Sequence, residues 1–226
     1  MKQIVDFLTE LNLNNNKEWF DSHKDQYLNA LEQFHSFTEQ LIDGIASFHK
    51  EILHLSVKDC TYRIYRDLRF SPDKTPYKTH MGAYICPEGK TSGYAGYYFH
   101  LEPRPKSTSS NHFMASGLWH PAPDVLKSVR DDILYNPQAY LESVRIAEGW
   151  IIDPDESLKR VPRGYPADSP HENLFRLRNH LLGRNMEDKY IYDKNLLKNV
   201  LSEFKKTHTF VALLNRSVTY ALTPQN

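Results

Sequence analysis

The stretch THMGAYICPEGKTSGYAGYYFHL, residues 79–101, decides the fold. Its first part, residues 79–86, alternates in side-chain character as expected of a β-strand with one buried face. The segment PEGK, residues 87–90, indicates a turn, because proline and glycine interrupt regular structure. A second alternating run fills residues 94–101, and one of its faces consists of Ala95, Tyr97, Phe99 and Leu101. Two strands joined by a short turn pair in antiparallel fashion, so a β-meander is predicted here.

Two further strands are expected beside this pair. Residues 61–67 also alternate, with Tyr62, Ile64 and Arg66 on one side and Arg63, Tyr65 and Asp67 on the other. A weaker strand is predicted over residues 106–115. The sequence therefore predicts an antiparallel sheet of about four or more strands within residues 60–115.

The N-terminal part of the chain is predicted to be helical. Residues 3–11 place apolar side chains at helical spacing, and an asparagine-rich turn follows. Asn15 or Asn16 is well placed to cap a second helix that continues to Phe48. A bend or an end is expected near Gly44, because glycine costs about 1 kcal/mol relative to alanine inside a helix.

Helical patterns return in the second half of the chain. They cover residues 124–133, 137–144, 172–182 and 196–206, and a last apolar segment covers residues 210–218. Helices, then consecutive strands, then helices are typical of an α+β fold. We expect an antiparallel β-meander packed by N-terminal and C-terminal helices, in a single domain that spans residues 1–226.

Composition narrows the classes of protein to consider. The chain has 226 residues, of which 40% are hydrophobic and 25% charged, as in an ordinary globular protein. Its 28 basic and 28 acidic residues balance, which argues against a protein that binds nucleic acid over its whole surface. Cys60 and Cys86 fit neither a disulfide framework nor a zinc motif. Without a signal peptide or a membrane-length apolar run, a cytoplasmic protein that does not enter membranes is expected.

Residues 61–80, TYRIYRDLRFSPDKTPYKTH, form a basic and aromatic segment. It carries five basic residues, Arg63, Arg66, Arg69, Lys74 and Lys78, but only two acidic ones, Asp67 and Asp73. Pro72 and Pro76 oppose regular ladder bonding, so the second half of the segment is expected to leave the sheet as a loop. An excess of positive charge with interleaved tyrosines is typical of an anion site.

A family resemblance rests on this segment and on four others. RIYRDLRFSPDKTPYKTH (residues 63–80) resembles the signature of a widespread bacterial and fungal family of conserved hypothetical proteins, which carry a domain of unknown function. The resemblance extends to NNNKEWFDSHKDQY (14–27), YYFHL (97–101), GLWHP (117–121) and LKRVPRGYPADSP (158–170). It covers most of the chain and implies a single α+β domain of bacterial type, without an established activity. At Ser116 this chain departs from the glycine that commonly precedes GLW.

Three functions are compatible with the basic segment. The first is a pocket for a small molecule that bears phosphate or carboxylate, and the same residues also suit nucleic-acid binding, which overall neutrality makes the weaker alternative. The third is a structural or protein-interaction domain in which Asp67 and Asp73 pair internally with the cations. The predicted ligand contacts are Arg63, Tyr65, Arg66, Arg69, Lys74, Tyr77 and Lys78, with Trp119 and His120 from a proline-framed loop. Arg69, Lys74 and Lys78 are favoured over Arg63, because they lie beyond the predicted strand.

Whether the protein is an enzyme stays open at this point, as does its oligomeric state. The candidate catalytic residues are Asp67, Asp73, His80 and Tyr77, because each can exchange a proton near a bound anion. His80, His100 and His120 could meet across neighbouring strands, but no recognisable metal spacing supports a metal site. Glycine-rich phosphate loops are absent as well, so no cofactor is predicted.

Overall fold

The computed structural model describes residues 1–104, 110–154 and 156–223. Within them lies a five-stranded sheet with strand order β1-β2-β3-β5-β4, in which every pair is antiparallel. The strands are β1 (Met81–Ile85), β2 (Gly96–Leu101), β3 (His112–Leu118), β4 (Ile151–Ile152) and β5 (His180–Met186). The α+β class and the antiparallel meander predicted from the sequence are therefore confirmed.

The first three strands form the meander. Met81 pairs with Leu101, and Phe99 pairs with Met114, so apolar residues of β1, β2 and β3 lie side by side. The strand predicted over residues 106–115 begins at His112 and continues to Leu118, while residues 106–109 lie outside the described part of the chain.

The N-terminal helices are α1 (Lys2–Leu13), α2 (Lys17–Ser22) and α3 (Lys24–Ala46). The predicted cap is correct: the side chain of Asn16 accepts a hydrogen bond of 2.9 Å from the backbone N–H of Trp19. The predicted continuous helix is wrong at His23, which adopts a non-helical conformation between α2 and α3. Gly44 lies in the last turn of α3, which ends at Ala46, as expected of an end near this glycine. A Cβ there would come within 2.4 Å of Leu201, so glycine allows α9 to approach α3.

Short helices η1 (Lys50–Ile52) and α4 (Val57–Cys60) lead from α3 to the basic segment. The later helices are α5 (Pro123–Tyr135), α6 (Pro137–Ile146), α7 (Glu172–Arg176), α8 (Asp188–Ile191) and α9 (Leu196–Leu222). The helix predicted over residues 172–182 is wrong in its second half, because Leu181 and Leu182 belong to β5 and pair with β3. A short apolar run does not distinguish a helix from a strand by its period.

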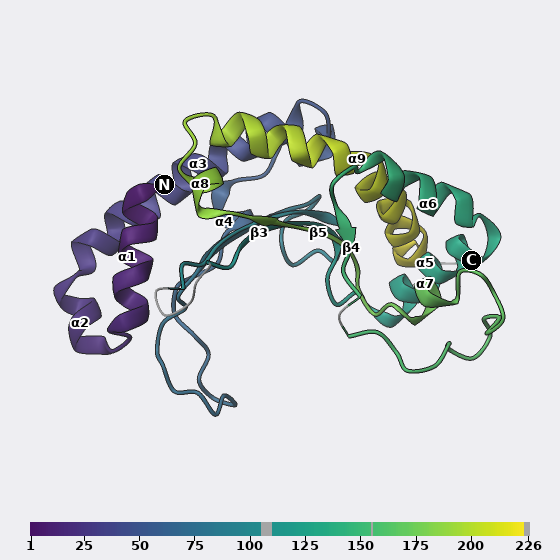
Figure 1. Ribbon diagram of the computed structural model, residues 1–226, viewed down its shortest axis with the longest axis horizontal. Helices are drawn as coiled ribbons and strands as arrows, with labels where there is room; N and C mark the ends of the chain where they lie inside the picture. The colour runs from purple at the N-terminus through teal and green to yellow at the C-terminus, as the bar shows by residue number, and fades with distance from the viewer. Residues whose placement is uncertain (105–109, 155, 224–226) are drawn as a thin grey trace.

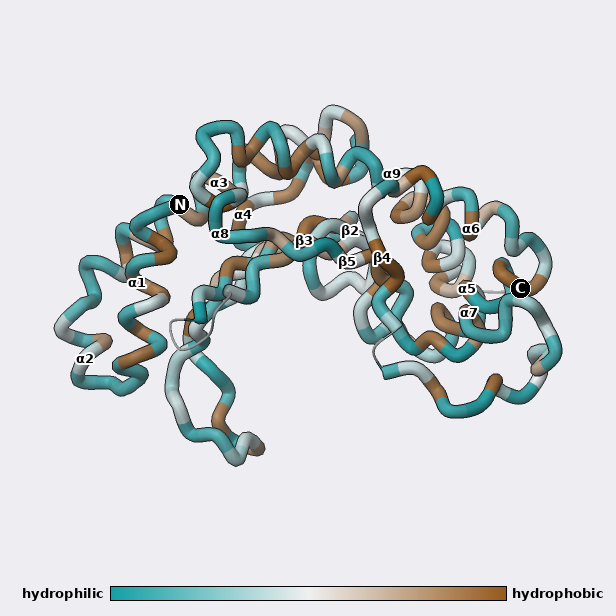
Figure 2. Tube along the Cα trace, in the orientation of Figure 1, coloured by the Kyte–Doolittle hydropathy of each residue, from teal (hydrophilic) through white to brown (hydrophobic). Residues whose placement is uncertain are grey.

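One face of the sheet is covered by helices. Figure 1 shows α3 and α9 lying along the same side of the strands. Tyr97 and Phe99 of β2 point to this side and are fully buried, with Phe99 against Phe37 of α3 and Tyr97 against Phe204 of α9. In Figure 2 the hydrophobic residues concentrate on the strands and on the helix segments that meet them. Of the helices in the described residues, none is long and apolar enough to cross a membrane.

The opposite face of the sheet lies on the concave side of the arch seen in Figure 1. Because side chains alternate along a strand, it carries Tyr84, Tyr98, His100 and Phe113. Tyr84, Tyr98 and Phe113 are half-buried, whereas His100 is buried beneath its neighbours. This face is therefore aromatic and polar instead of aliphatic.

The strand predicted over residues 61–67 is wrong. Within residues 61–80 the structure has only isolated bridges, one from Thr61 to Ala83 of β1 and one from Tyr65 to Tyr77. The segment pairs with itself: the N–H of Arg66 donates to the carbonyl of Pro76 at 3.0 Å, and that of Lys78 to Ile64 at 2.8 Å. It therefore forms an arm, residues 61–80, that projects from the edge of the sheet in Figure 1 and is largely hydrophilic in Figure 2.

Candidate functional site

The arm is held by aromatic packing and by one asparagine. The side chain of Asn15 donates to the carbonyl of Tyr77 at 2.9 Å and accepts from its N–H at 3.1 Å, as a neighbouring strand would. The ring of Tyr77 stacks on Phe20 of α2 with centroids 4.0 Å apart, and Tyr65 packs against both rings. Tyr77 is only 5% exposed, and burial raises the pKa of its hydroxyl. Tyr77, a predicted ligand contact, therefore anchors the arm to α2, and Tyr65 packs at the same place.

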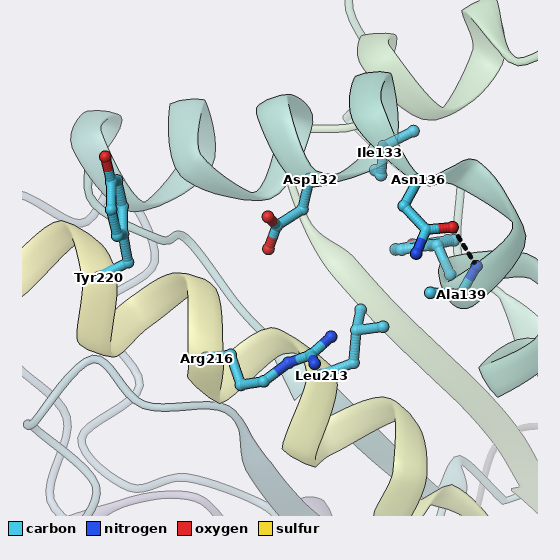
Figure 3. A pocket seen from close by; sticks show the side chains of 8 residues that line it. Asp132, Ile133, Asn136, Ala139, Leu213, Arg216 and Tyr220 are labelled. Atoms are coloured by element: carbon cyan, nitrogen blue, oxygen red, sulfur yellow. Dashed lines mark hydrogen bonds between the residues drawn. The ribbon is translucent and has the colours of Figure 1, made fainter.

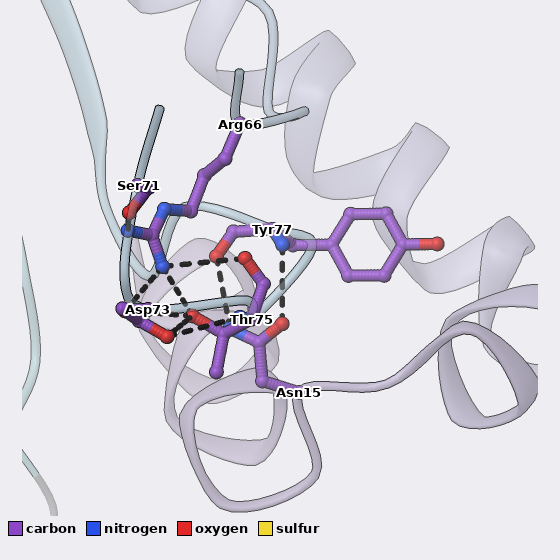
Figure 4. A network of polar contacts seen from close by, with 6 residues as sticks. All are labelled: Asn15, Arg66, Ser71, Asp73, Thr75 and Tyr77. Carbon is purple, nitrogen blue, oxygen red and sulfur yellow. Dashed lines mark hydrogen bonds and ion pairs between the residues drawn. The ribbon is translucent and has the colours of Figure 1, made fainter. Parts of the chain in front are cut away.

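Arg66 binds the turn of the arm (Figure 4). Its guanidinium donates to the carboxylate of Asp73 and to the hydroxyl of Thr75, and also to the carbonyl of Thr75 at 3.2 Å. The carboxylate of Asp73 accepts the backbone N–H of Thr75 at 2.9 Å. Mainly this backbone bond, and then Arg66, lower the pKa of Asp73 to about 2. Arg66 and Asp73 thus form an ion pair within the arm.

The tip of the arm contains the second internal ion pair. Arg69 donates to Asp67 through Nη2 at 2.7 Å and through Nε at 3.0 Å. The ammonium of Lys74 donates to the carbonyl of Leu68 at 3.0 Å. The tip is exposed, and the ring of Phe70 has 93% of its surface in solvent. Both aspartates proposed as catalytic groups are thereby engaged by arginines.

Two neighbouring cations of the arm form no ion pair with any described residue. Within the described residues, neither Arg63 nor Lys78 forms an ion pair with a carboxylate. The backbone bond from Lys78 to Ile64 brings the two cations to neighbouring positions of the arm. Half-buried Lys78 places its ammonium 5.5 Å from the centre of the Tyr62 ring. Burial, and then the like charge of Arg63, lower the pKa of Lys78. An anion would relieve this repulsion.

His80 lies where the arm joins β1. Its ring centroid is 4.7 Å from that of His100, and no described residue forms a hydrogen bond with its imidazole. Burial lowers the pKa of His80 to about 4, with a smaller contribution from His100 and opposition from Glu102. His80 is therefore a neutral imidazole at pH 7 with both ring nitrogens available. Of the other three catalytic candidates, Asp67 and Asp73 form ion pairs and Tyr77 is buried as an anchor of the arm. His80 has neither restriction.

A hydrogen-bonded row lies beside His80 on the concave face. The hydroxyl of Tyr98 bonds Nδ1 of His100 at 2.8 Å, and Nε2 of His100 lies 3.4 Å from the carboxylate of Glu102. Hydrogen bonds from His100 and from Asn111 lower the pKa of Glu102 to about 2. Tyr98 and Glu102 are not among the site residues predicted from the sequence. Their signal is the period of two in YYFHLE, residues 97–102, which puts all three polar groups on one face.

Trp119 and His120 are not part of this arrangement. They follow β3 at the end opposite to His112, and a strand of this length spans about 20 Å. The imidazole of His120 instead approaches Glu156, with Nδ1 3.7 Å from the carboxylate. The backbone N–H of His120 donates to the side-chain oxygen of Asn179. The expected meeting of three histidines is therefore wrong for His120 and correct for His80 with His100.

Neither metal nor thiol chemistry is evident in the described residues. No group of three histidines, cysteines or acidic residues there could hold a metal ion. Cys60 and Cys86 are buried free thiols. Burial raises the pKa of Cys60 to about 12 and that of Cys86 to about 11, so both stay protonated at pH 7.

Two cavities lie away from the arm. One of about 330 Å³ lies between α5, α6 and α9, with Asp132 and Arg216 among its walls (Figure 3). The other, of about 990 Å³, lies between η1, the turn after β1, and α9. Neither is lined by residues 61–80, so Arg63, Lys78 and His80 do not belong to these two cavities.

These features define an α+β protein with helices on one face of its sheet and a basic, aromatic arm at the β1 edge. The family model described as "Conserved hypothetical protein (DUF2461)" matches residues 3–212. The chain therefore belongs to this family, a domain of unknown function, and the resemblance noted in the sequence is confirmed. Comparisons with curated proteins and with solved structures give no significant match.

Proposed function

We propose that this protein binds a small molecule bearing phosphate or carboxylate at the surface made by Arg63, Lys78 and His80, named here the basic face. The observation that carries the proposal is the pair of cations, Arg63 and Lys78, that no described carboxylate neutralises. The other three cations of the arm bond to Asp73, Asp67 and a backbone carbonyl. Lys74 also lacks a carboxylate partner among the described residues, but Arg63 and Lys78 lie close enough for the charge of Arg63 to lower the pKa of Lys78, so the excess positive charge is densest at the basic face.

The neighbouring groups suit recognition of a small ligand. The exposed ring of Tyr62 beside Lys78 offers a surface on which a planar group can stack. His80 offers one donor and one acceptor, and it can exchange a proton with a bound acid group. The row of Tyr98, His100 and Glu102 fixes the ring of His100 on which His80 rests. Binding is the proposed function, and acid–base catalysis by His80 is its extension.

The internal ion pairs support a structural role for another part of the signature. Arg66, Arg69 and the two aspartates hold the shape of the arm, as the structural alternative predicts for them. They do not involve Arg63, Lys78 or His80. The two roles therefore fall on different residues of the same segment.

Lys78→Ala tests the proposal. A thermal-stability screen with pyrophosphate, nucleotides, sugar phosphates and tricarboxylic acids is expected to yield at least one stabilising ligand. A ligand at 100 times its dissociation constant adds about 2.7 kcal/mol to the free energy of unfolding. The alanine variant is expected to lose this stabilisation because it removes one of the two neighbouring cations of the basic face.

Lys198→Ala is the matched control, since it removes the same charge from the exposed side of α9. It should respond to ligand as the unmodified protein does. Equal loss in both variants would show general charge screening and contradict a site at the basic face. Mixed-sequence oligonucleotides belong in the same screen. Salt-dependent binding to them, without a response to any small anion, would favour the nucleic-acid alternative.

A further inference from the structure

The larger cavity lies beside α9 and shares no lining residue with the basic face. Its volume of about 990 Å³ is in the range of small-molecule sites. Polar and charged side chains converge on it from η1, with its N-cap residue, and from α9. They include His49, Lys50, Glu51, His208 and Arg216. Pro87 and Glu88 close it from the turn after β1, and Phe48 and Ala212 contribute apolar walls.

A chain of four polar groups runs through the wall of this cavity. The hydroxyl of Tyr97 lies 3.1 Å from Nδ1 of His49 and 3.0 Å from Nδ1 of His208. Nε2 of His49 is 3.7 Å from the carboxylate of Glu51. Tyr97 is fully buried, so its hydroxyl has two imidazoles and no solvent around it. The order of the chain is Glu51, His49, Tyr97, His208.

The carboxylate sets the direction of these hydrogen bonds. A negative oxygen beside Nε2 of His49 favours the tautomer with its hydrogen on that nitrogen, which leaves Nδ1 as an acceptor. The single hydrogen of the Tyr97 hydroxyl must then go to His49. The hydroxyl oxygen in turn accepts a hydrogen from Nδ1 of His208. A neutral His208 therefore has a free lone pair on Nε2, and no described residue forms a hydrogen bond with that nitrogen.

Both imidazoles are suited to remain neutral. Burial lowers the pKa of His49 and of His208, and Glu51 only partly opposes this effect. Burial likewise raises the pKa of the Tyr97 hydroxyl, so the hydroxyl keeps its hydrogen. The hydrogen bonds between His49, Tyr97 and His208 thus run in one direction at pH 7.

The cavity also presents cations. Lys50 and Arg216 line it, and within the described residues neither forms an ion pair with a carboxylate. Arg216 also borders the smaller cavity, where Figure 3 shows it on α9 opposite Asp132 of α5. Asp132 accepts a hydrogen bond from Ser217. An anionic group of a ligand can therefore pair with Arg216 or Lys50.

We infer that this cavity is a second ligand site, independent of the basic face, for an anionic molecule that carries a hydroxyl group. The hydroxyl donates to Nε2 of His208, and the anionic group pairs with Lys50 or Arg216. Glu51, His49 and Tyr97 are positioning residues that keep Nε2 of His208 free of hydrogen. Hydroxy acids and the phosphate esters of polyols have this combination of groups.

Binding of a matched ligand pair tests the inference. Glycerol 3-phosphate and propyl phosphate differ in the two hydroxyl groups, and their affinities can be measured from the amide chemical shifts of Ala212 and Asn215. The expected result is that glycerol 3-phosphate binds at least tenfold more tightly, since a lone pair left without a partner in the complex is unfavourable. His208→Ala should remove this preference, and His120→Asn, at an exposed site elsewhere, should keep it. Equal affinities of the unmodified protein, or shifts confined to the basic face, would overturn the inference.

The tautomer of His208 provides a test that needs no ligand. Nitrogen-15 chemical shifts of the unmodified protein should show hydrogen on Nδ1 of His208 and on Nε2 of His49. Tyr97→Phe, which removes the intervening hydroxyl, should release His208 to a mixture of tautomers. Hydrogen found on Nε2 of His208 in the unmodified protein would refute the proposed direction of the chain.

Discussion

Replacing Phe20 with alanine is expected to lower the free energy of unfolding by about 3–5 kcal/mol, as the loss of a fully buried phenylalanine typically does. Phe20 is 1% exposed and contacts Phe7 and Tyr27 as well as Tyr77. The variant leaves a cavity at the place where α2 holds the arm. Chemical denaturation measures the loss.

Amide hydrogen exchange distinguishes a loss of stability confined to the arm from a loss throughout the fold. Amide hydrogen exchange at Tyr77 should accelerate more in Phe20→Ala than exchange in β2, because the arm loses its stacking partner first. Phe70→Ala is the matched control: it removes the same ring from the exposed tip and should change stability by less than about 0.5 kcal/mol. If both variants lose the same stability, the arm is not anchored through Phe20.

Gly117→Ala is expected to cost about 3 kcal/mol or more through backbone strain and steric overlap. Gly117 has a φ of 130°, a conformation that residues with a Cβ rarely adopt. A Cβ at this position would also lie 2.0 Å from the carbonyl oxygen of His180 in the neighbouring strand. Because that oxygen belongs to the backbone, relief requires β3 and β5 to separate. Thermal or chemical unfolding measures the cost.

Gly183→Ala provides the control within the same sheet. Gly183 lies in β5 opposite Ala115, and a Cβ there would meet no atom within 4 Å. This variant should be within about 0.5 kcal/mol of the unmodified protein. A comparable loss in both variants would mean that glycine content, and not the close approach at Gly117, limits the stability of the sheet.

The central strands were predictable because their pattern is strictly local. Residues 81–85 and 96–101 alternate, a turn separates them, and the register follows from burying Tyr97 and Phe99 on one side. The cap at Asn16 was predictable for the same reason, since it depends on neighbours three residues away. By contrast, the first three residues of β5, 180–182, were predicted to be helical, because the strand that pairs with them, β3, lies far earlier in the chain.

The arm shows where a local pattern misleads. Residues 61–67 alternate as a strand does, but their partner is the segment around Pro76 and Tyr77 and not the sheet. Asn15, 62 residues away, then completes the hydrogen bonds of Tyr77. Such an interaction over a long sequence distance leaves no periodic trace.

The candidate site was predictable by segment but not by residue. The excess of positive charge identified residues 61–80. The structure then separates the cations that form ion pairs within the arm from those that do not. Arg69 and Lys74, favoured in the sequence analysis, bond within the arm, whereas Arg63 and Lys78 stay available. His80 was weighed as a catalytic group, but its contact with His100 and the row that ends at Glu102 required the strand register.

The most direct test of the proposed anion site is the titration of His80, followed by its imidazole proton resonances with and without excess pyrophosphate or citrate. Lys78, His100 and Glu102 surround this imidazole, and its pKa without ligand is about 4. A bound anion favours the protonated imidazole, so its pKa should rise by about one to two units with at least one of the two ligands. Binding should accordingly tighten as the pH falls through the new value. The rise should vanish in Lys78→Ala and persist in Lys198→Ala, whereas a His80 titration unchanged by both anions would contradict anion binding at the basic face.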